Sequence, residues 1–226
     1  MNTCLKNNQY VGGYFLVITY RAAKRSEKKQ LTQLLTTSFL SYDYYKMHVQ
    51  NEVKRIRFVE TIQELCIKIA FKQDYPVFVG VMKDQLVSVA VLIPPKAKKV
   101  SLIDYLFAGG VKLARYGGVK NALGFLDMLE ESNAACHREY PDAWFLEVLA
   151  VSPEVQGKGI GGKMITEWIE PFIQTQGGGV LTLITNSERN RIFYQKNGFV
   201  EFHEGRLVTK ERQLGNWSYQ KVISST

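Results

Sequence analysis

The chain has 226 residues, 46% of them hydrophobic, so it can bury a sizeable core as one domain. No segment approaches the roughly 20 apolar residues of a membrane-spanning helix, and three scattered cysteines, Cys4, Cys66 and Cys136, indicate neither a disulfide framework nor a zinc site. The net charge of +8 suits a polyanionic ligand, nucleic acid or an ordinary basic surface. Because the basic residues are dispersed, we favour the ordinary surface and expect no nucleic-acid or membrane partner.

The first part of the chain is expected to hold one strand and two helices, after a flexible polar lead at residues 1–13 that lacks a signal-peptide cleavage site. Residues 14–226 are expected to form a single domain, and Phe15–Tyr20 near its start has the composition of a strand. Ser26 is a candidate cap for a helix with apolar residues at i, i+3, i+4 and i+8, and Val59–Phe71 has a second helical pattern. Between these helices lie tyrosines that either shape a substrate pocket or simply pack: Tyr42, Tyr44 and Tyr45.

Two β-rich runs come next, Val77–Met82 and Leu86–Ile93, joined by a short polar link that is typical of a hairpin. In residues 100–135, apolar residues at helical spacing are interrupted by glycine pairs. This pattern predicts two or three helices rather than a linker.

The most informative stretch is residues 144–199. The apolar run Trp144–Val151 suits a buried strand, and four closely spaced glycines follow it. Apolar residues then recur at helical spacing from Met164 to Ile173, although Pro171 should remove one hydrogen bond and kink this helix. The order of strand, glycine loop and helix makes an anion site, because glycines let backbone N–H groups approach a phosphate and a helix N-terminus adds partial positive charge.

Three ligand classes use such a loop, and spacing separates them. Gly157-x-Gly159-x-x-Gly162 fits the dinucleotide fingerprint, but five residues separate it from its strand, and no acidic residue closes the next strand, Val180–Thr185. The same glycines followed by Lys163 approach a nucleotide P-loop, yet Met164 stands where a Ser or Thr hydroxyl would hold Mg²⁺. What remains is the segment from Gln156 to Gly161, preceded by Val151-Ser152-Pro153.

The loop from Val151 to Gly161, VSPEVQGKGIG, resembles the Gln/Arg-x-x-Gly-x-Gly/Ala signature of the GNAT superfamily of N-acetyltransferases. A second motif follows in family-like order, Asn190-x-x-Phe-Tyr194-x-x-Asn-Gly-Phe, similar to the family's tyrosine helix and Gly-Phe pair. His137 and the Pro141-x-x-Trp144 entry look most like the puromycin N-acetyltransferase-like branch. The resemblance covers about residues 135–200, whereas the N-terminal half matches only in outline.

The resemblance implies a fold and a cosubstrate. The fold would be a GNAT-like mixed α/β fold, in which helices flank a central, largely antiparallel, splayed β-sheet. Strands near Val200–His203 and Trp217–Val222 would complete this sheet. Acetyl-CoA would be the cosubstrate, its binding core would span about residues 144–200, and no metal is expected.

The resemblance also implies where acetyl-CoA would lie. Its pantetheine and thioester would run along Leu149, Ala150 and Val151, where a splay opens the sheet. Its pyrophosphate would lie on the backbone amides of the loop: Gln156, Gly157, Lys158, Gly159, Ile160, Gly161 and Gly162. Asn190 resembles a coenzyme-binding asparagine of the family, and its alternative is a role at the N-terminus of its helix.

Acetyl transfer needs a neutral amine, a stabilised carbonyl oxygen and a proton for the departing thiolate. Tyr194 matches the family's general acid, because a phenol with a pKa near 10 is protonated at neutral pH, and its alternative is a core aromatic. Glu147 is the candidate base, on the same side of its strand as Phe145 and Leu149, since a carboxylate in an apolar run is costly without a partner or a purpose. The alternatives are a substrate contact or an ion pair for Glu147, and His137 or ordered water as the base.

The sequence therefore predicts a cytoplasmic, acetyl-CoA-dependent N-acetyltransferase that acetylates a primary amine of a small molecule by direct attack on the thioester. Two alternatives stay open: a protein-substrate N-acetyltransferase, and a catalytically silent module that binds or senses acyl-CoA. The identity of the amine is beyond the sequence. The oligomeric state is also open, and a homodimer is compatible with it.

Overall fold

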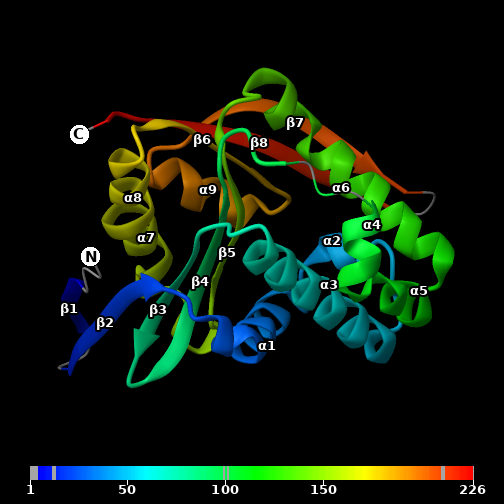
Figure 1. The fold of residues 1–226 in the computed structure, drawn as a ribbon, viewed down its shortest axis with the longest axis horizontal. Coiled ribbons are helices and arrows are strands. Elements are labelled where there is room, and N and C mark those ends of the chain that lie inside the picture. The colour runs from blue at the N-terminus through cyan, green and yellow to red at the C-terminus, as the bar shows by residue number, and fades with distance from the viewer. Residues whose placement is uncertain (1–4, 12–13, 99, 101, 210–211, 226) are drawn as a thin grey trace.

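The structure, a computed structural model, describes residues 5–11, 14–98, 100, 102–209 and 212–225 (Figure 1). Within these residues, the centre is a mixed sheet of eight strands in the order β1-β2-β3-β4-β5-β6-β8-β7. Neighbouring strands are antiparallel except β5 and β6, which run parallel. The strands are β1 Leu5–Val11, β2 Tyr14–Ala22, β3 Val77–Met82, β4 Gln85–Ile93, β5 Trp144–Val151, β6 Gly179–Thr185, β7 Val200–Val208 and β8 Gln213–Ile223.

Helices cover both faces of the sheet. Figure 1 shows α7 and α8 on one side of β4 and β5, and α1 and α3 on the other. The helices that come between β4 and β5 in the sequence extend this second layer. The longest of them, α6, contacts β6, β7 and β8. The helices are α1 Lys28–Phe39, α2 Asp43–Lys46, α3 Glu52–Lys72, α4 Leu102–Tyr105, α5 Val111–Gly117, α6 Val119–Glu139, α7 Ile160–Met164, α8 Glu170–Thr175 and α9 Glu188–Lys196. No described helix is long and apolar enough to cross a membrane.

Three apolar clusters hold these layers together. The first lies between the sheet and α7, α8 and α9, and it includes Ile165, Leu183 and Tyr194. The second lies between the sheet and the helices α1 and α3. The third joins α2, α3, α5 and α6 around Phe125. The two faces of the sheet therefore have separate cores, and a side chain that reaches from one core to the other must pass where two strands separate.

The N-terminal expectations need two corrections. Residues 1–4 and 12–13 of the expected lead lie outside the described residues, but Leu5–Val11 forms the strand β1 and pairs with β2 along its whole length. A polar strand is tolerated there because β1 is an edge, where one side of the backbone pairs and the other faces outward. Ser26 does not cap the first helix: it lies in a 3₁₀ turn, Arg25–Glu27, and α1 begins at Lys28.

Other elements follow their predictions, some with different limits. The helix predicted at Val59–Phe71 is α3, which begins earlier because the Asn51 side chain accepts a hydrogen bond from the Lys54 N–H and caps it. The predicted hairpin is β3 and β4, and the helices predicted within residues 100–135 are found at residues 102–117 and 119–139. The predicted last two strands are β7 and β8, both longer than expected.

The helix after the glycine loop contains the predicted irregularity at Pro171. Ile165–Ile169 forms a π-helical turn between α7 and α8, in which the Glu170 N–H donates to the Ile165 carbonyl five residues earlier. The proline ring would clash with the carbonyl four residues before it in a regular helix. A wider turn directly before Pro171 relieves that clash, so the helix continues through the proline.

Candidate active site

The sheet opens between β5 and β6. These parallel strands pair at only two positions, Trp144 with Leu181 and Phe145 with Thr182. Beyond Phe145, β5 pairs only with β4, while β6 continues to pair with β8 as far as Thr185. The predicted splay therefore lies beside the second half of β5. One edge of Leu146–Val151 faces this opening, where an extended ligand could run along the strand.

Glu147 is the extra residue of a β-bulge in β5. Val91 of β4 lies opposite Val148, and the next residue of β4, Leu92, lies opposite Leu146, so Glu147 has no partner of its own. The bulge reverses the alternation of side chains: Leu146 and Leu149 both belong to the first core, while Val148 belongs to the second. The prediction that Glu147 shares the face of Leu149 is therefore wrong, because simple alternation fails at a bulge.

The Glu147 carboxyl lies among weakly polar groups. Burial raises its pKa to about 7. Burial also raises the pKa of four groups around it, and the Glu147 charge adds to each rise: Tyr44, Cys66, Tyr75 and Tyr105. No described residue forms a hydrogen bond or ion pair with Glu147. Such a carboxyl changes its charge near neutral pH, as a general base should.

The glycine loop presents a run of free backbone donors. The Val155 N–H donates to Ser152 and the Lys163 N–H donates to Gly159, but among the described backbone hydrogen bonds none has its donor between residues 156 and 162. Gly157 and Gly159 have φ angles of 79° and 72°, in the left-handed region that glycine adopts without strain. The loop therefore aims several N–H groups outward at the start of α7, as an anion cradle does.

Two hydrogen bonds fix this loop to the sheet, and a third, from α1, shares the acceptor of one of them. The Gln156 side-chain amide donates to the Val151 carbonyl over 2.9 Å, and the Ser38 hydroxyl donates to the same oxygen over 3.3 Å. The Tyr20 hydroxyl on β2 donates to the Ile160 carbonyl over 2.8 Å. The Val151 carbonyl is thus occupied within the protein and is not free for pantetheine. Of the loop residues, Gln156 contributes a clamp as well as a backbone amide.

Tyr194 lies on α9, on the face that carries the first core. It is buried, and its ring lies 5.5 Å from that of Phe199 and 6.1 Å from that of Tyr219. Burial, and after it the charge of Tyr42, raise the pKa of Tyr194 well above its ordinary value, so the phenol keeps its proton at neutral pH. Its hydroxyl makes no hydrogen bond to a described residue. A protonated, unengaged phenol fits a proton donor, and its aromatic neighbours show that it is also a core residue.

The structure distinguishes Tyr42 from the other two tyrosines that the sequence analysis grouped with it as pocket or packing residues. The Asn186 N–H, directly after β6, donates to the Tyr42 hydroxyl over 2.9 Å. The neighbouring tyrosines differ, because Tyr44 and Tyr45 pack around Phe125 in the third core. The only sequence signal was the tyrosine-rich stretch itself, since no local pattern indicates which of its members reaches the sheet opening.

Two weaker candidates occupy less central positions. His137 is exposed in the last turn of α6, where its ring lies 5.7 Å from that of Phe145, at the closed end of the opening. Asn190 lies in the first turn of α9, and its backbone N–H donates to Ser187 over 2.9 Å. Its side chain forms no hydrogen bond with a described residue and is free for a ligand. Ser187 occupies the N-cap position of α9 without a side-chain hydrogen bond.

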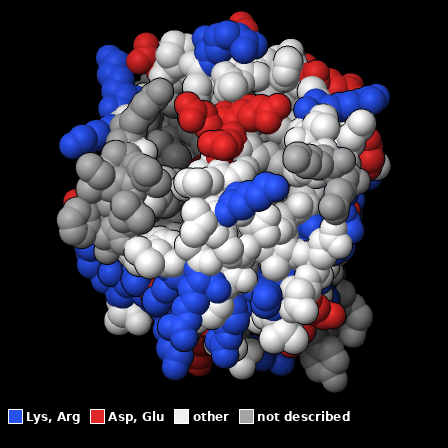
Figure 2. Space-filling model, turned by 90° about the vertical axis from the view of Figure 1, so that its right-hand side faces the viewer, with Lys and Arg blue, Asp and Glu red and all other residues white. Residues whose placement is uncertain are grey.

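A cavity of about 760 Å³ lies where the turn before α3, the helices α5 and α6 and the end of β7 meet. Figure 2 views the molecule from this side and shows acidic side chains gathered between basic ones. Asp127 and Glu131 line the cavity, and neither forms an ion pair or hydrogen bond with a described residue. Burial raises the pKa of Tyr44, and the charges of Glu147 and Glu131 both add to this rise. Tyr44 is therefore within electrostatic range of both Glu147 and the cavity residue Glu131.

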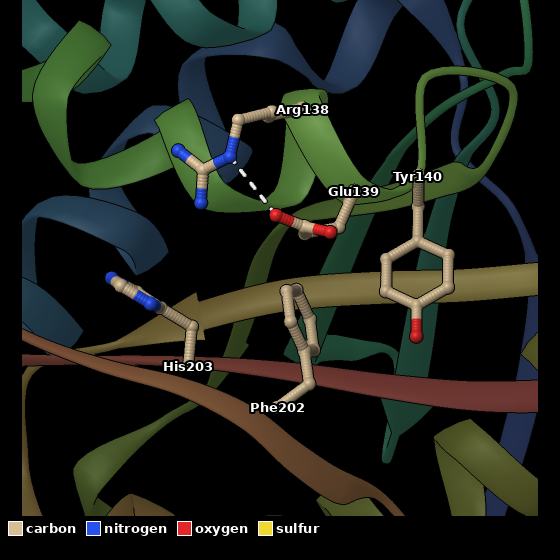
Figure 3. Close-up of a pocket in the computed structure, with 5 residues that line it drawn as sticks. All are labelled: Arg138, Glu139, Tyr140, Phe202 and His203. Atoms are coloured by element: carbon tan, nitrogen blue, oxygen red, sulfur yellow. Dashed lines mark hydrogen bonds and ion pairs between the residues drawn. The ribbon is translucent and has the colours of Figure 1, made fainter.

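A smaller cavity, of about 240 Å³, is formed by the end of α6 and the start of β7 (Figure 3). Tyr140 and Phe202 form one side, with ring centroids 4.9 Å apart, and Arg138 pairs with Glu139 over 2.9 Å beside His203. None of these residues lies on the glycine loop or in the second half of β5. Among the described residues, no group of three or more His, Cys, Asp or Glu side chains is arranged to hold a metal ion.

Known proteins share both a sequence pattern and the fold with this chain. Residues 114–201 match the family model described as an acetyltransferase (GNAT) domain. Solved structures share the fold at low identity. The polyamine N-acetyltransferase of Drosophila melanogaster is 15% identical with a TM-score of 0.59, covering 91% of this chain and 99% of its own. The ribosomal-protein-S18-alanine N-acetyltransferase of Escherichia coli is 13% identical with a TM-score of 0.53, covering 92% and 96%. The predicted splayed, mixed α/β GNAT fold is confirmed.

Proposed function

We propose that this chain moves an acetyl group from acetyl-CoA to a primary amine of a small molecule. The match of residues 114–201 to the GNAT acetyltransferase domain supports N-acetyl transfer as the reaction. One observation carries the proposal. The sheet opens between β5 and β6, and β5, which borders this opening, carries a carboxyl with a pKa of about 7 and leads into a loop with free backbone donors. The core on one face of the same sheet holds the protonated, buried phenol of Tyr194.

In this proposal, the chain's own groups handle two protons. Glu147, ionised above a pH of about 7, accepts a proton from the attacking amine. As the new C–N bond forms, the C–S bond of the thioester breaks and the sulfur leaves with its electron pair. Tyr194 donates its proton to that sulfur, and the cycle closes when solvent returns a proton to Tyr194 and takes one from Glu147. The enzyme itself forms no covalent bond to the acetyl group.

The binding assignment follows the same geometry. The N–H groups of Gln156, Gly157, Lys158, Gly159, Ile160, Gly161 and Gly162 would hold the pyrophosphate, because they lack acceptors within the described chain. Leu149, Ala150 and the Val151 N–H would pair with the pantetheine along the open edge of β5. Asn190, whose amide is unengaged, would add a contact from α9.

The acceptor site would be reached through the cavity beside α6. Its volume of about 760 Å³ suits a small molecule, and the unpaired carboxylates of Asp127 and Glu131 suit a cation. The puromycin N-acetyltransferase-like motif around His137 also favours a small amine. The Drosophila enzyme is described as forming N-acetylagmatine, whereas the Escherichia coli enzyme is described as acting on an alanine of a ribosomal protein. A protein acceptor therefore remains the second candidate.

Two further assignments accompany the proposal. The enzyme would act in the cytoplasm, since Cys66 and Cys136 are free thiols and neither is paired in a disulfide. A homodimer is compatible with this site, because no contact between copies is needed to bring its groups together.

Calorimetric titration with acetyl-CoA tests the proposal, with NADH and ATP as controls. We expect micromolar binding of acetyl-CoA alone, followed by thiol release when amines are added. Tyr194→Phe should reduce turnover while sparing acetyl-CoA binding. Binding without turnover over a broad amine and peptide set would indicate the silent, acyl-CoA-sensing alternative, and binding of a control nucleotide instead would refute the loop assignment.

A further inference from the structure

Tyr42 reaches the opening of the sheet from the side opposite to α9. Its ring packs in an edge-to-face arrangement on Phe39, with centroids 5.7 Å apart, and lies 6.4 Å from that of Tyr45. Its hydroxyl accepts a hydrogen bond from the Asn186 N–H, at the point where β6 ends. A phenol from the helical layer is thus fixed to the backbone of the central sheet.

A buried amide network makes this attachment rigid. The Asn186 side-chain amide donates to the Gly215 carbonyl over 2.8 Å and to Asn216 Oδ1 over 3.0 Å. The Asn216 amide in turn donates to the Ser132 carbonyl on α6 over 2.9 Å. Both asparagines are buried, at 6% and 4% exposure. The end of β6, the start of β8 and α6 are therefore locked together around the group that holds Tyr42.

Two hydroxyl groups at this point have no acceptor. A hydroxyl carries one donor and two lone pairs, and the Asn186 N–H uses a lone pair of Tyr42, which leaves its proton to be donated. No described residue accepts that proton in a hydrogen bond of standard geometry. Thr185 beside it is 2% exposed, and its buried hydroxyl also makes no hydrogen bond of standard geometry. Buried donors without acceptors point to a missing ligand or water.

The strand register places these hydroxyls opposite the expected position of the thioester. Phe145 and Thr182 are the last pair between β5 and β6, and Thr185 lies three residues further along β6, where this strand borders the opening beside the second half of β5. Thr185 lies on the same face of β6 as Leu181 and Leu183, because side chains two residues apart point to the same side of a strand. That face belongs to the first core, where Tyr194 also lies. Tyr42 enters from the other face, so hydroxyls from both sides of the sheet meet at one opening.

The pKa shifts of Tyr42 and Tyr194 are consistent with hydroxyl groups that lie close together at this opening. Burial raises the pKa of Tyr42, while the nearby Thr185 hydroxyl and then the Asn186 N–H oppose part of the rise. Ionisation of Tyr42 would in turn raise the pKa of Tyr194, so the two phenols are within electrostatic range of each other. Tyr42 therefore stays protonated at neutral pH, as a hydrogen-bond donor must be.

We propose that the Tyr42 and Thr185 hydroxyls form an oxyanion site that binds the acetyl carbonyl oxygen of the thioester. When the amine nitrogen bonds to the carbonyl carbon, the C=O π electrons move onto that oxygen, and the two fixed O–H donors stabilise the charge without transferring a proton. The electrons return to re-form C=O as the C–S bond breaks, and the sulfur takes its proton from Tyr194. This inference rests on the proposed function, because it assigns further residues to the same reaction.

Infrared spectroscopy of bound [1-¹³C]acetyl-CoA tests the inference directly. A hydrogen bond to the carbonyl lowers its stretching frequency, so Tyr42→Phe and Thr185→Val should each raise the frequency relative to the wild type, while Tyr194→Phe should leave it unchanged. Losing one oxyanion donor typically costs about 10²–10³ in kcat. We expect a fall in kcat on this scale for Tyr42→Phe, with less than a twofold change in the KM for acetyl-CoA.

Tyr45→Phe is the matched control, since it removes a neighbouring buried phenol that accepts a hydrogen bond from Gln63 over 2.8 Å, away from the opening. It should leave both the carbonyl frequency and kcat unchanged. An unaltered frequency in both Tyr42→Phe and Thr185→Val would overturn the inference, even if kcat fell, because the hydroxyls would then act only structurally. Wild-type protein that fails to bind acetyl-CoA would instead remove the proposed function itself.

Discussion

The side-chain amide of Gln156 donates a hydrogen bond of 2.9 Å to the carbonyl oxygen of Val151, five residues earlier. The glycine loop is therefore tied back to the strand that it leaves. This closure holds the free N–H groups of residues 156–162 in one arrangement before any ligand is bound. Such preorganisation improves affinity because less conformational freedom is lost on binding.

Removing this clamp should weaken acetyl-CoA binding. A single hydrogen bond contributes about 1 kcal/mol, so Gln156→Ala is expected to raise the Kd about fivefold in calorimetric titration. Gln195→Ala changes an exposed glutamine on α9 and serves as the matched control, with no expected effect. Equal Kd values for Gln156→Ala and the wild type would show that the loop keeps its shape without the clamp.

The pH dependence of turnover should report Glu147. Burial raises its pKa to about 7, and only the ionised form accepts the amine proton. We expect kcat/KM to fall about tenfold per pH unit below 7 and to level off above it, once the ionisation of the amine substrate is corrected for. Glu147→Gln should lower kcat/KM and abolish this limb. A wild-type limb that persists in Glu147→Gln would assign the base to another group.

The same carboxyl should destabilise the folded protein at alkaline pH. Its folded pKa of about 7 exceeds its ordinary value of 4.5, so below pH 4.5 it is protonated in both states and has no effect. As the pH rises from 4.5 through 7, the unfolded state ionises more readily, and stability is lost by up to about 3 kcal/mol.

Chemical unfolding at pH 4.5 and pH 8 measures this effect. Glu147→Gln and the wild type should have similar free energies of unfolding at pH 4.5, and the variant should be the more stable one at pH 8. Glu130→Gln, at an exposed site on α6, provides the control and should show no pH-dependent difference. A wild type as stable as Glu147→Gln at pH 8 would contradict the raised pKa.

The carboxylates at the cavity should favour acceptors with a second positive charge. Asp127 and Glu131 line the cavity and are exposed and unpaired within the described chain. Exposed charges interact weakly, so Asp127→Asn or Glu131→Gln should each raise the KM for a diamine about two- to fivefold. The KM for a matched monoamine should stay the same.

Salt provides an independent check of this charge effect. The difference between diamine and monoamine should shrink as ionic strength rises, because exposed charges are screened within about 10 Å at 0.1 M salt. Glu130→Gln, on the same helix but outside the cavity lining, should leave both KM values unchanged. Equal effects on both amines would place the acceptor elsewhere.

The features that the sequence predicted well are local. The strand, glycine loop and helix between residues 144 and 175 depend on composition, spacing and turn chemistry within a few residues. The same holds for the tyrosine helix α9 and for the hairpin of β3 and β4. The irregularity at Pro171 was also predictable, because a proline alters its own helix whatever surrounds it.

Other features depend on partners that are distant in the sequence, and only the folded structure reveals them. The bulge at Glu147 exists only in the register of β5 against β4, so alternation along β5 alone assigned the wrong neighbour to its carboxyl. The position of Tyr42 depends on the Asn186 N–H, 144 residues away, and β1 depends on its pairing with β2. Composition and local spacing establish which chemical groups the chain can offer. Long-range pairing of backbone and side-chain donors decided which of them meet at the opening of the sheet, because such contacts leave no periodic trace in the sequence.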